Sequence, residues 1–397
     1  TIIDAINTFL YSKLLIVILI GSGIYFTIRT RFPQVRLFRK ACNAVMEKPE
    51  GKESVSSFQA LMVSTASRVG TGNIVGVSSA ICIGGVGSVF WMWIIAILGS
   101  ASALAESTLA QIYKKKGEDG RCYGGPAYYI EAALHSRGLA VVFCIAMILT
   151  YAFGFNMLAS YNLQSTFAGQ PFYNADITPW IIGGILALVM GWCLLGGGNR
   201  IVKVTSTLVP FMGIAYILVS LLVVVLNIGQ LPSVMAQIFK EAFDFKAIFA
   251  GFAGSAMMQG IRRGLYSNEA GIGSAPNAAA SAVVSQPVKQ GLVQMLSVFI
   301  DTLLLCTATA MMCLVSGVIP AKELQGAPWV QAALHKTLGS FGPYFIMIAM
   351  VLFAFTTLLG NCFYCDNLLT YIHKKQPDRK FMTGFRIVSA LAVFWGA

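Results

Sequence analysis

Charged side chains are scarce in this sequence, and their scarcity excludes a soluble globular protein of ordinary composition. Only 11% of the 397 residues are Asp, Glu, Lys or Arg, whereas 56% are hydrophobic. A soluble domain carries about 25% charged residues, which form its polar shell. Because the apolar residues come in long runs, the sequence predicts a polytopic α-helical membrane protein with the lipid bilayer as its surroundings.

Histidine is also scarce, and the cysteines form no recognisable site. All three His residues (His135, His335 and His373) lie in predicted loops or at helix ends, which argues against a histidine metal site. The nine Cys are odd in number and mostly lie inside apolar runs, where Cys packs as a small hydrophobe. A membrane-embedded enzyme would need a cluster of such side chains at midplane, so we predict no catalytic residues.

Ten apolar runs are long enough to be considered as membrane spans. The last run ends with the sequence and is shorter than the about 20 residues that a span needs, so we expect further helices beyond it. The runs cover residues 14–28, 56–84, 88–112, 139–167, 178–195, 201–227, 243–261, 286–317, 342–372 and 383–397.

The net charge of +12 reflects membrane topology rather than nucleic-acid binding. Of the 28 Lys and Arg residues, 22 lie in alternate loops, at 29–52, 113–138, 196–203, 262–290 and 373–386. Basic loops stay in the cytoplasm, so the pattern predicts a multi-pass membrane protein with its N-terminus outside. A nucleic-acid-binding protein would instead gather these charges on one face of a soluble module.

Two of the apolar runs are interrupted where a spanning helix should be most apolar. The second run contains Ser, Arg, Thr, Asn and two Gly within residues 64–73, and the seventh contains Gly and Ser at 250–255. Each Gly weakens a helix by about 1 kcal/mol, and an opened turn at membrane depth is tolerated where it lines a cavity. The two runs cross the membrane in opposite directions, which is typical of inverted repeats around a midplane substrate site.

The interruptions divide the chain into three predicted regions. Residues 1–55 form one extra N-terminal spanning helix and a cytoplasmic loop, and residues 56–227 form a first repeat of five helices. Residues 228–397 form a second repeat that is incomplete at its C-terminal end.

The opened turn in the second run is the strongest candidate binding site. Free N–H groups at a helix start bind anions, so the amides of Gly70, Thr71 and Gly72 are candidates for a substrate carboxylate. Glycine also lets a ligand approach the backbone closely. The alternative is that these glycines permit close helix packing, which does not account for the polar residues in the same turn.

A buried charge and a hydroxyl pair accompany the opened turn. Arg68 costs several kcal/mol at membrane depth unless it meets a carboxylate, and the candidates are Glu106, Glu269 and Asp301. A structural ion pair and a direct transport or gating role both remain open for it. Thr356 and Thr357 either bond their own helix backbone or supply oxygen ligands to sodium, a hard cation.

Several motifs resemble a known family, the alanine or glycine:cation symporters, also called sodium:alanine symporters. They are Arg-Val-Gly-Thr-Gly-Asn at 68–73, Gly-Gly-Pro-Ala at 124–127, Phe-Ile-Asp-Thr at 299–302 and a long stretch at 263–276 that contains Ser-Asn-Glu-Ala-Gly. The resemblance covers essentially the whole chain. It implies eleven helices, with leucine-transporter-like inverted five-helix repeats after one extra N-terminal helix.

The resemblance also implies roles for individual residues. It gives the substrate carboxylate to the amides of Gly70, Thr71 and Gly72, and the substrate ammonium to carbonyls around Ala253 and Gly254. It gives one sodium site to the carbonyls of Ala66 and Val69 with Thr356 and Thr357. Asn73 and the carbonyl of Arg68 would touch substrate or a second cation, although the charge of Arg68 departs from the wider fold.

We therefore predict a sodium-driven symporter of a prokaryotic plasma membrane that carries alanine or glycine into the cell, with Na⁺ as the co-transported ion. One alternative is a proton-coupled carrier that uses Asp301 or Glu106, and another is a sodium-coupled carrier of a larger amino acid such as glutamine. A channel would show a polar stripe along several helices, and the sequence has only local interruptions. The sequence fixes neither the amino acid nor the oligomeric state.

Overall fold

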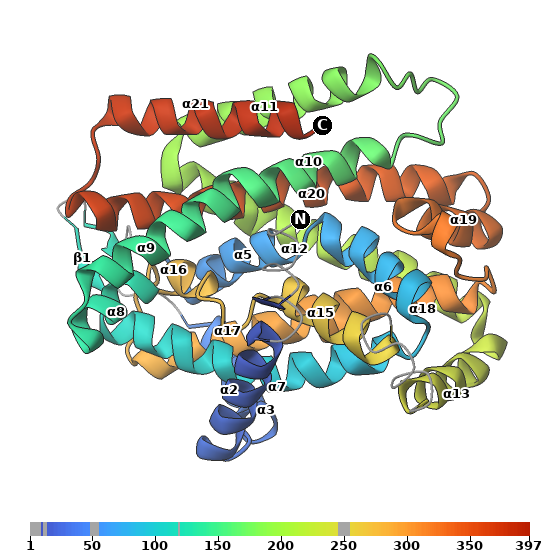
Figure 1. Ribbon diagram of the computed structural model, residues 1–397, viewed down its shortest axis with the longest axis horizontal. Coiled ribbons are helices and arrows are strands. Elements are labelled where there is room, and N and C mark those ends of the chain that lie inside the picture. Colours follow the sequence, from blue (N-terminus) through green and yellow to red (C-terminus); the bar gives the residue numbers. More distant parts are fainter. Residues whose placement is uncertain (1–8, 11–13, 48–54, 118–119, 245–254) are drawn as a thin grey trace.

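Long helices that run along one common direction make up most of the fold (Figure 1). The computed structural model describes residues 9–10, 14–47, 55–117, 120–244 and 255–397. Within them, strands β1 (Lys115–Lys116) and β2 (Cys122–Tyr123) form one antiparallel hairpin. This hairpin and helix α8 (Pro126–Leu134) lie at one end of the molecule, and α13 (Leu231–Ala242) and α19 (Ala327–Leu338) lie at the other.

Six helices in the described ranges are long and apolar enough to cross a membrane. They are α7 (Ser88–Ile112), α9 with α10 (Arg137–Ser165), α11 (Thr178–Leu195), α12 (Gly197–Leu226), α17 with α18 (Pro287–Val315) and α20 (Phe341–His373). Two apolar helices are shorter: α2 (Leu15–Arg29) and the continuous segment Gly72–Gly84. Helix α21 (Arg379–Gly396) packs on α10 and α11 and forms an outer layer with α11 (Figure 1). The prediction of a polytopic helical membrane protein is confirmed.

Several spans contain wide π-helical turns, and short helices connect the spans. A π-helical segment, η3 (Leu149–Gly154), joins α9 (Arg137–Ile148) to α10 (Phe155–Ser165), and another, η6 (Phe299–Cys306), joins α17 (Pro287–Val298) to α18 (Thr307–Val315). Such turns are rare and concentrate at functional sites. The connecting elements are α3 (Pro33–Arg36), α4 (Phe38–Val45), η4 (Ile228–Gln230), α16 (Ala275–Ala279) and η7 (Lys322–Leu324).

The second apolar run folds as two helices with a break between them. Helix α5 (Ser57–Arg68) begins at a capping box, in which the Ser56 hydroxyl accepts from Gln59 N–H and the Gln59 amide accepts from Ser56 N–H. It ends at Val69, whose backbone leaves the helical region with φ −80° and ψ 86°. The chain resumes as a π-helical segment, η2 (Gly72–Gly76), and then as α6 (Val77–Gly84).

Helix α15 (Ala256–Asn268) continues beyond the end predicted for the seventh run. Its first turn is capped by the Ser255 hydroxyl, which accepts from Met258 N–H at 3.3 Å. The prediction that Arg262 and Arg263 lie in a loop is wrong, because the helix ends only where Glu269 adopts a left-handed conformation with φ 51°. The interruption predicted before Ser255 lies outside the described residues.

The broken second span packs directly against the seventh. Helix α6 contacts α15, and α5 contacts α12 and α20. The opened turn between α5 and α6 therefore lies inside the largest cluster of buried hydrophobic residues. Val69 and Ile74, on either side of the break, are fully buried in this cluster. The predicted boundaries of the two repeats, 56–227 and 228–397, stay a prediction.

Candidate functional site

The side chain of Asn73 holds the opened turn. Its Oδ1 accepts a hydrogen bond from Gly70 N–H at 3.1 Å, and its Nδ2 donates to Oδ1 of Asp301 at 2.7 Å. Asn73 therefore ties the break in the second span to the π-helical turn of another span. The amide of Gly70 is engaged in this contact, whereas Thr71 and Gly72 begin the next helical segment, where N–H groups have no partner within the helix.

Asp301 lies at the centre of the packed helices and is fully buried. Its second carboxylate oxygen accepts the Thr302 hydroxyl at 2.7 Å. The π-helical turn η6 directs this carboxylate towards the opened turn, where Asn73 meets it. The sequence motif Asp301-Thr302 thus belongs to the same site as the glycines of the second span.

The glycines of the opened turn make room for two side chains from other helices. A Cβ at Gly70 would collide with the hydroxyl of Thr357, and a Cβ at Gly72 or Gly76 would collide with the guanidinium of Arg263. The predicted alternative of close helix packing therefore has a specific form here. Because glycine has no side chain, the hydroxyl of Thr357 and the guanidinium of Arg263 approach the backbone closely at these positions.

The two threonines of α20 point in different directions. The hydroxyl of Thr356 donates to carbonyls of its own helix, to Leu352 O at 3.0 Å, and faces Met212 of α12. The hydroxyl of Thr357 is buried without a hydrogen-bond partner and lies against Gly70. An unpaired buried oxygen is costly unless a ligand meets it, so the structure brings Thr357, and not Thr356, to the opened turn.

A chain of polar side chains crosses the helices beside the opened turn. The Ser67 hydroxyl contacts Oε1 of Glu269 at 3.3 Å and Oδ1 of Asn361 at 2.7 Å, and Asn361 Nδ2 donates to Oδ1 of Asn156 at 2.9 Å. The other oxygen of Glu269 accepts the Ser274 hydroxyl at 2.7 Å. This chain joins α5, α10, α20 and the end of α15, and all of its members are buried.

Glu106 of α7 holds the glycine-rich turn that follows α15. Its two carboxylate oxygens accept the N–H groups of Gly271 at 3.2 Å and Gly273 at 3.1 Å. Both glycines have positive φ, 84° and 85°, a conformation that other residues rarely adopt. Glu106 therefore clamps a turn of the backbone rather than facing the opened helix directly.

Arg68 is buried at the end of α5 and has an incomplete set of partners. Its Nη1 lies 3.4 Å from Gln294 O, while Nε and Nη2 have no hydrogen-bond partner. Arg68 interacts electrostatically with both Glu269 and Glu106, and no ion-pair contact joins it to either within the part of the chain that the structure describes. Asp301, the third predicted partner, is bonded to Asn73 instead.

A small cavity of about 30 Å³ lies between the opened turn and the surrounding helices. Large side chains, Phe155 and Tyr266, form one wall, and the guanidinium of Arg263 stacks over the Tyr266 ring at 5.0 Å. Of the predicted site residues it is lined by Arg68, Gly70, Thr71, Gly72, Thr357 and Glu269. Ala66 and Val69 are buried in the adjoining turn of α5, and Ala253 and Gly254 lie outside the described residues.

Sequence reasoning missed several residues of this site, among them Arg263, Asn156 and Asn361. Arg263 was assigned to a basic loop, although it lies eight residues after Ser255, the last small residue of the break, which is only about two turns of helix. Asn156 and Asn361 are polar residues inside apolar runs, and a buried amide in a spanning helix is itself a signal of function.

Comparison with known proteins gives the same assignment for the whole chain. A family model described as the sodium:alanine symporter family matches residues 1–397. The chain is 36% identical over 403 residues to the sodium/alanine symporter AgcS of Methanococcus maripaludis, covering 100% of this chain and 88% of that protein. It is 43% identical over 386 residues to the amino-acid carrier protein AlsT of Bacillus subtilis, covering 97% of this chain and 81% of that protein.

A third relative and one solved structure complete the comparison. The Bacillus subtilis protein named "Probable sodium/glutamine symporter GlnT" is 44% identical over 397 residues, covering 99% of this chain and 81% of that protein. The crystal structure of MhsT in complex with L-phenylalanine superposes with a TM-score of 0.58 at 15% identity, covering 87% of this chain and 80% of that one. At this identity the likeness concerns the fold, and the predicted leucine-transporter-like fold is confirmed.

Proposed function

Because the chain belongs to the sodium:alanine symporter family, we propose that it carries alanine or glycine into a prokaryotic cell together with sodium. The observation that carries this proposal is the opened turn at Gly70, with an unpaired hydroxyl, free helix-start amides and a small cavity around it. Such a turn offers the positive end of one half-helix to a carboxylate and carbonyl oxygens of the other half to a cation.

The amide groups of Thr71 and Gly72 are the proposed site for the substrate carboxylate. Both residues line the cavity, and the Thr71 hydroxyl accepts from Asn162 Nδ2 at 3.2 Å, which orients the turn. The guanidinium of Arg263, which lies against Gly72, adds a positive charge on the same side. For the substrate ammonium we keep the ligands that the family resemblance implies, the carbonyls around Ala253 and Gly254.

The carbonyls of Ala66 and Val69 and the hydroxyl of Thr357 are the proposed sodium ligands. These three oxygens come from the two sides of the contact between α5 and α20, at the point where α5 unwinds. Sodium bound there fixes the opened conformation that the substrate requires, which couples the two binding events. Thr356 is left out of the proposed ligand set, since its hydroxyl stays bonded to its own helix.

Buried charges around the opened turn favour the uptake of one cation. Three carboxylates are buried in this part of the described structure: Glu106 and Glu269 interact electrostatically with Arg68, and Asp301 interacts with Arg263. Each carboxylate that is ionised adds to the attraction for a cation at the opened turn. A buried cluster is far more stable when its charges balance.

The bulk around the cavity supports a small substrate over glutamine. Phe155 and Tyr266 pack edge to face at a centroid distance of 5.2 Å and line the cavity. A longer side chain would have to displace this aromatic pair. A methyl group or a hydrogen atom as the side chain demands less additional room than the side chain of glutamine.

The contacts and the burial of the carboxylates act in opposite directions on their ionisation. Asp301 accepts a hydrogen bond from Asn73 Nδ2, and Glu106 accepts two backbone N–H groups. N–H donors stabilise the ionised form of a carboxylate, whereas burial favours its neutral form. Proton coupling through Asp301 or Glu106 is therefore the alternative that the uptake experiment has to separate from sodium coupling.

Uptake of radiolabelled alanine into proteoliposomes tests the proposal with the full-length protein. An inward sodium gradient at equal pH on both sides is expected to drive accumulation above equilibrium, and excess glycine is expected to inhibit it more strongly than glutamine. Accumulation driven by a proton gradient without sodium would replace sodium as the coupling ion. Stronger inhibition by glutamine would overturn the substrate assignment.

A further inference from the structure

The first helix ends in a sharp corner at the surface of the molecule. Helix α2 ends at Arg29, and α3 begins at Pro33. Between them, Arg31 and Phe32 adopt left-handed backbone conformations, with φ 57° and 53°. Residues other than glycine rarely adopt this conformation unless the surrounding structure imposes it. The fold therefore holds the corner in this shape.

Hydrogen bonds from a buried side chain fix the corner to its neighbours. Gln34 is buried, and its Nε2 donates to Thr27 Oγ1 of α2 at 2.8 Å and to Ile97 O of α7 at 3.0 Å. The backbone N–H of Phe32 donates to Thr27 O at 2.8 Å. Because these bonds join α2, α3 and α7, the corner presents a defined set of side chains to its surroundings.

Large apolar side chains point outward at this corner. Phe32 and Val35 are 61% and 83% exposed, and Ile28, in the last turn of α2, is 63% exposed. Figure 1 shows α2 and α3 at the edge of the molecule, where they project from the long helices. Exposed apolar side chains beside basic residues, at the end of an apolar helix, are typical of a segment that lies in the membrane interface.

Three arginines lie among these apolar side chains and line one surface cavity. The cavity has a volume of about 380 Å³ and is lined by Arg29, Arg31 and Arg36. Its walls also include the apolar side chains of Leu104 from α7 and Val288 from α17. No carboxylate is among the described residues that line it. We call it the corner cavity.

The guanidinium groups of the corner cavity have few partners within the protein. In the described part of the chain, the side chains of Arg29 and Arg31 form no hydrogen bond or ion pair, and both are exposed. Arg36 Nη2 donates to Thr30 O at 2.9 Å, which leaves its other N–H groups for a ligand. A guanidinium matches the oxygens of a phosphate group in both geometry and charge. The corner cavity therefore fits an anion that has a phosphate group and an apolar part.

We propose that the corner cavity binds an anionic phospholipid, with the phosphate on Arg29, Arg31 and Arg36 and the acyl chains beside Ile28 and Phe32. The loop 29–52 carries seven Lys and Arg residues and is predicted to face the cytoplasm, and the cytoplasmic leaflet carries anionic lipids. A soluble phosphate compound would meet the arginines and leave the exposed apolar side chains in water. A phospholipid meets both.

A second basic cavity, of about 410 Å³, provides a comparison within the same molecule. It lies beside β1 and is lined by several exposed lysines, among them Lys115, Lys374 and Lys375. Glu131 also lines it and lies 3.7 Å from Arg137. If net charge alone attracted lipid, these lysines would matter as much as the arginines of the corner cavity.

Native mass spectrometry of the full-length protein in detergent counts the bound lipid directly. One phosphatidylglycerol molecule is expected to stay bound per protomer under conditions that remove phosphatidylcholine. The variant with Arg29→Gln, Arg31→Gln and Arg36→Gln is expected to bind phosphatidylglycerol at least about tenfold more weakly, because it loses several charged contacts. Equal retention of the two lipids by the wild-type protein would overturn the proposal.

The matched control removes the same number of charges from the second basic cavity. Lys115→Gln, Lys374→Gln and Lys375→Gln together are expected to leave the affinity for phosphatidylglycerol nearly unchanged. Equal weakening in the two triple variants would show that lipid is attracted by net charge alone, and would remove the specific site.

A second variant and two soluble probes distinguish a lipid from a free phosphate compound. Phe32→Ser with Val35→Ser keeps all three arginines and is expected to weaken phosphatidylglycerol binding, because the acyl chains lose their contacts. Inorganic phosphate and glycerol 3-phosphate are expected to raise the melting temperature in detergent much less than phosphatidylglycerol does. An equal rise with either soluble probe, lost in the triple arginine variant, would assign the cavity to a soluble phosphate compound and overturn the lipid site. Neither alanine nor sodium enters these measurements, so their outcome is independent of the proposed function.

Discussion

Asn73 is the residue on which the opened turn depends most directly. Asn73→Ala removes the acceptor of Gly70 N–H and the donor to the buried Asp301. Leaving a buried carboxylate without its donor costs about 1–3 kcal/mol. We expect a lower melting temperature in detergent and loss of alanine uptake, and sodium is expected to stabilise the variant less than it stabilises the wild type.

The control for this prediction is Asn227→Ala. Asn227 also donates to a backbone carbonyl and to a side chain, Val223 O at 2.9 Å and Thr337 Oγ1 at 3.3 Å, but it lies far along α12 from the opened turn. It is expected to lower stability slightly and to keep the full sodium effect. An equal sodium effect in the two variants would contradict the role given to Asn73.

The neighbouring threonines of α20 provide a matched pair for the sodium site. Thr357→Ala removes the unpaired hydroxyl beside Gly70, whereas Thr356→Ala removes one that is bonded to its own helix. Loss of one ligand is expected to raise the sodium concentration for half-maximal uptake about tenfold or more in Thr357→Ala. Thr356→Ala is expected to leave it nearly unchanged. A larger increase of this sodium concentration in Thr356→Ala than in Thr357→Ala would contradict a sodium site at the opened turn.

This pair also shows what the sequence could and could not predict about individual residues. The sequence predicted that the pair Thr356 and Thr357 belongs to the site. Because successive residues of a helix point about 100° apart, the rotation of α20 about its axis decides which of the two hydroxyls faces the opened turn. The same limit applies to Gly70, whose amide is taken by a side chain three residues away. Residue type is predicted from the sequence, whereas direction depends on the packing of several helices.

At the scale of elements, the surface pair between Glu47 and Lys289 links the basic loop after α4 to the start of α17. Lys289 Nζ donates to Glu47 Oε1 at 2.7 Å, and this bond holds the pKa of Glu47 below its ordinary value of 4.5. A lowered pKa means that the stabilisation is complete above pH 4.5 and is lost as pH falls through the lowered value.

Glu47→Gln is therefore expected to lower stability slightly at neutral pH and not at all in strong acid. The effect is about 0.2–1 kcal/mol, since both side chains are partly exposed, 32% and 25%. Thermal unfolding in detergent at several pH values measures it, with the exposed Glu323→Gln as the control. A difference from wild type that persists unchanged into strong acid would show that the pair contributes through packing rather than charge.

Element positions were more predictable than element ends. The predicted runs 88–112 and 178–195 coincide with α7 and α11, because both are continuous apolar segments bounded by polar or glycine-rich turns. Helix α15 was cut short at residue 261 because Arg262 and Arg263 resemble a cytoplasmic boundary. A buried cation in a spanning helix breaks the hydrophobic pattern on which the prediction of spans depends.

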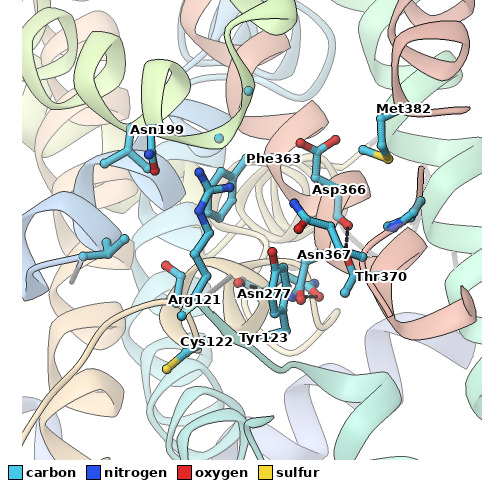
Figure 2. Close-up of a pocket in the computed structure, with 18 of the residues that line it drawn as sticks. Arg121, Cys122, Tyr123, Asn199, Asn277, Phe363, Asp366, Asn367, Thr370 and Met382 are labelled. Atoms are coloured by element: carbon cyan, nitrogen blue, oxygen red, sulfur yellow. Dashed lines mark hydrogen bonds between the residues drawn. The ribbon is translucent and has the colours of Figure 1, made fainter. Parts of the chain in front are cut away.

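At the scale of the whole molecule, strict coupling requires that sodium alone keeps the inner side closed. A carrier that opened inwards with sodium alone would dissipate the gradient without moving substrate. Sodium must therefore favour a state that is closed on the inner side, and the amino acid must remove that preference. We expect such a transition to open and close the cavity of about 420 Å³ between the basic loops and α20, here called the vestibule cavity (Figure 2).

Native cysteines report this transition. Cys122 is partly exposed and lines the vestibule cavity, Cys42 is exposed on α4, and the other seven cysteines are buried. In inside-out vesicles we expect sodium alone to slow the reaction of Cys122 with an impermeant maleimide, and sodium with alanine to restore it. Cys42 is expected to react at one rate throughout, which makes it the internal control. If sodium left Cys122 as reactive as before, the vestibule would stay open in the sodium-bound state, and coupling would have to reside in the opened turn alone.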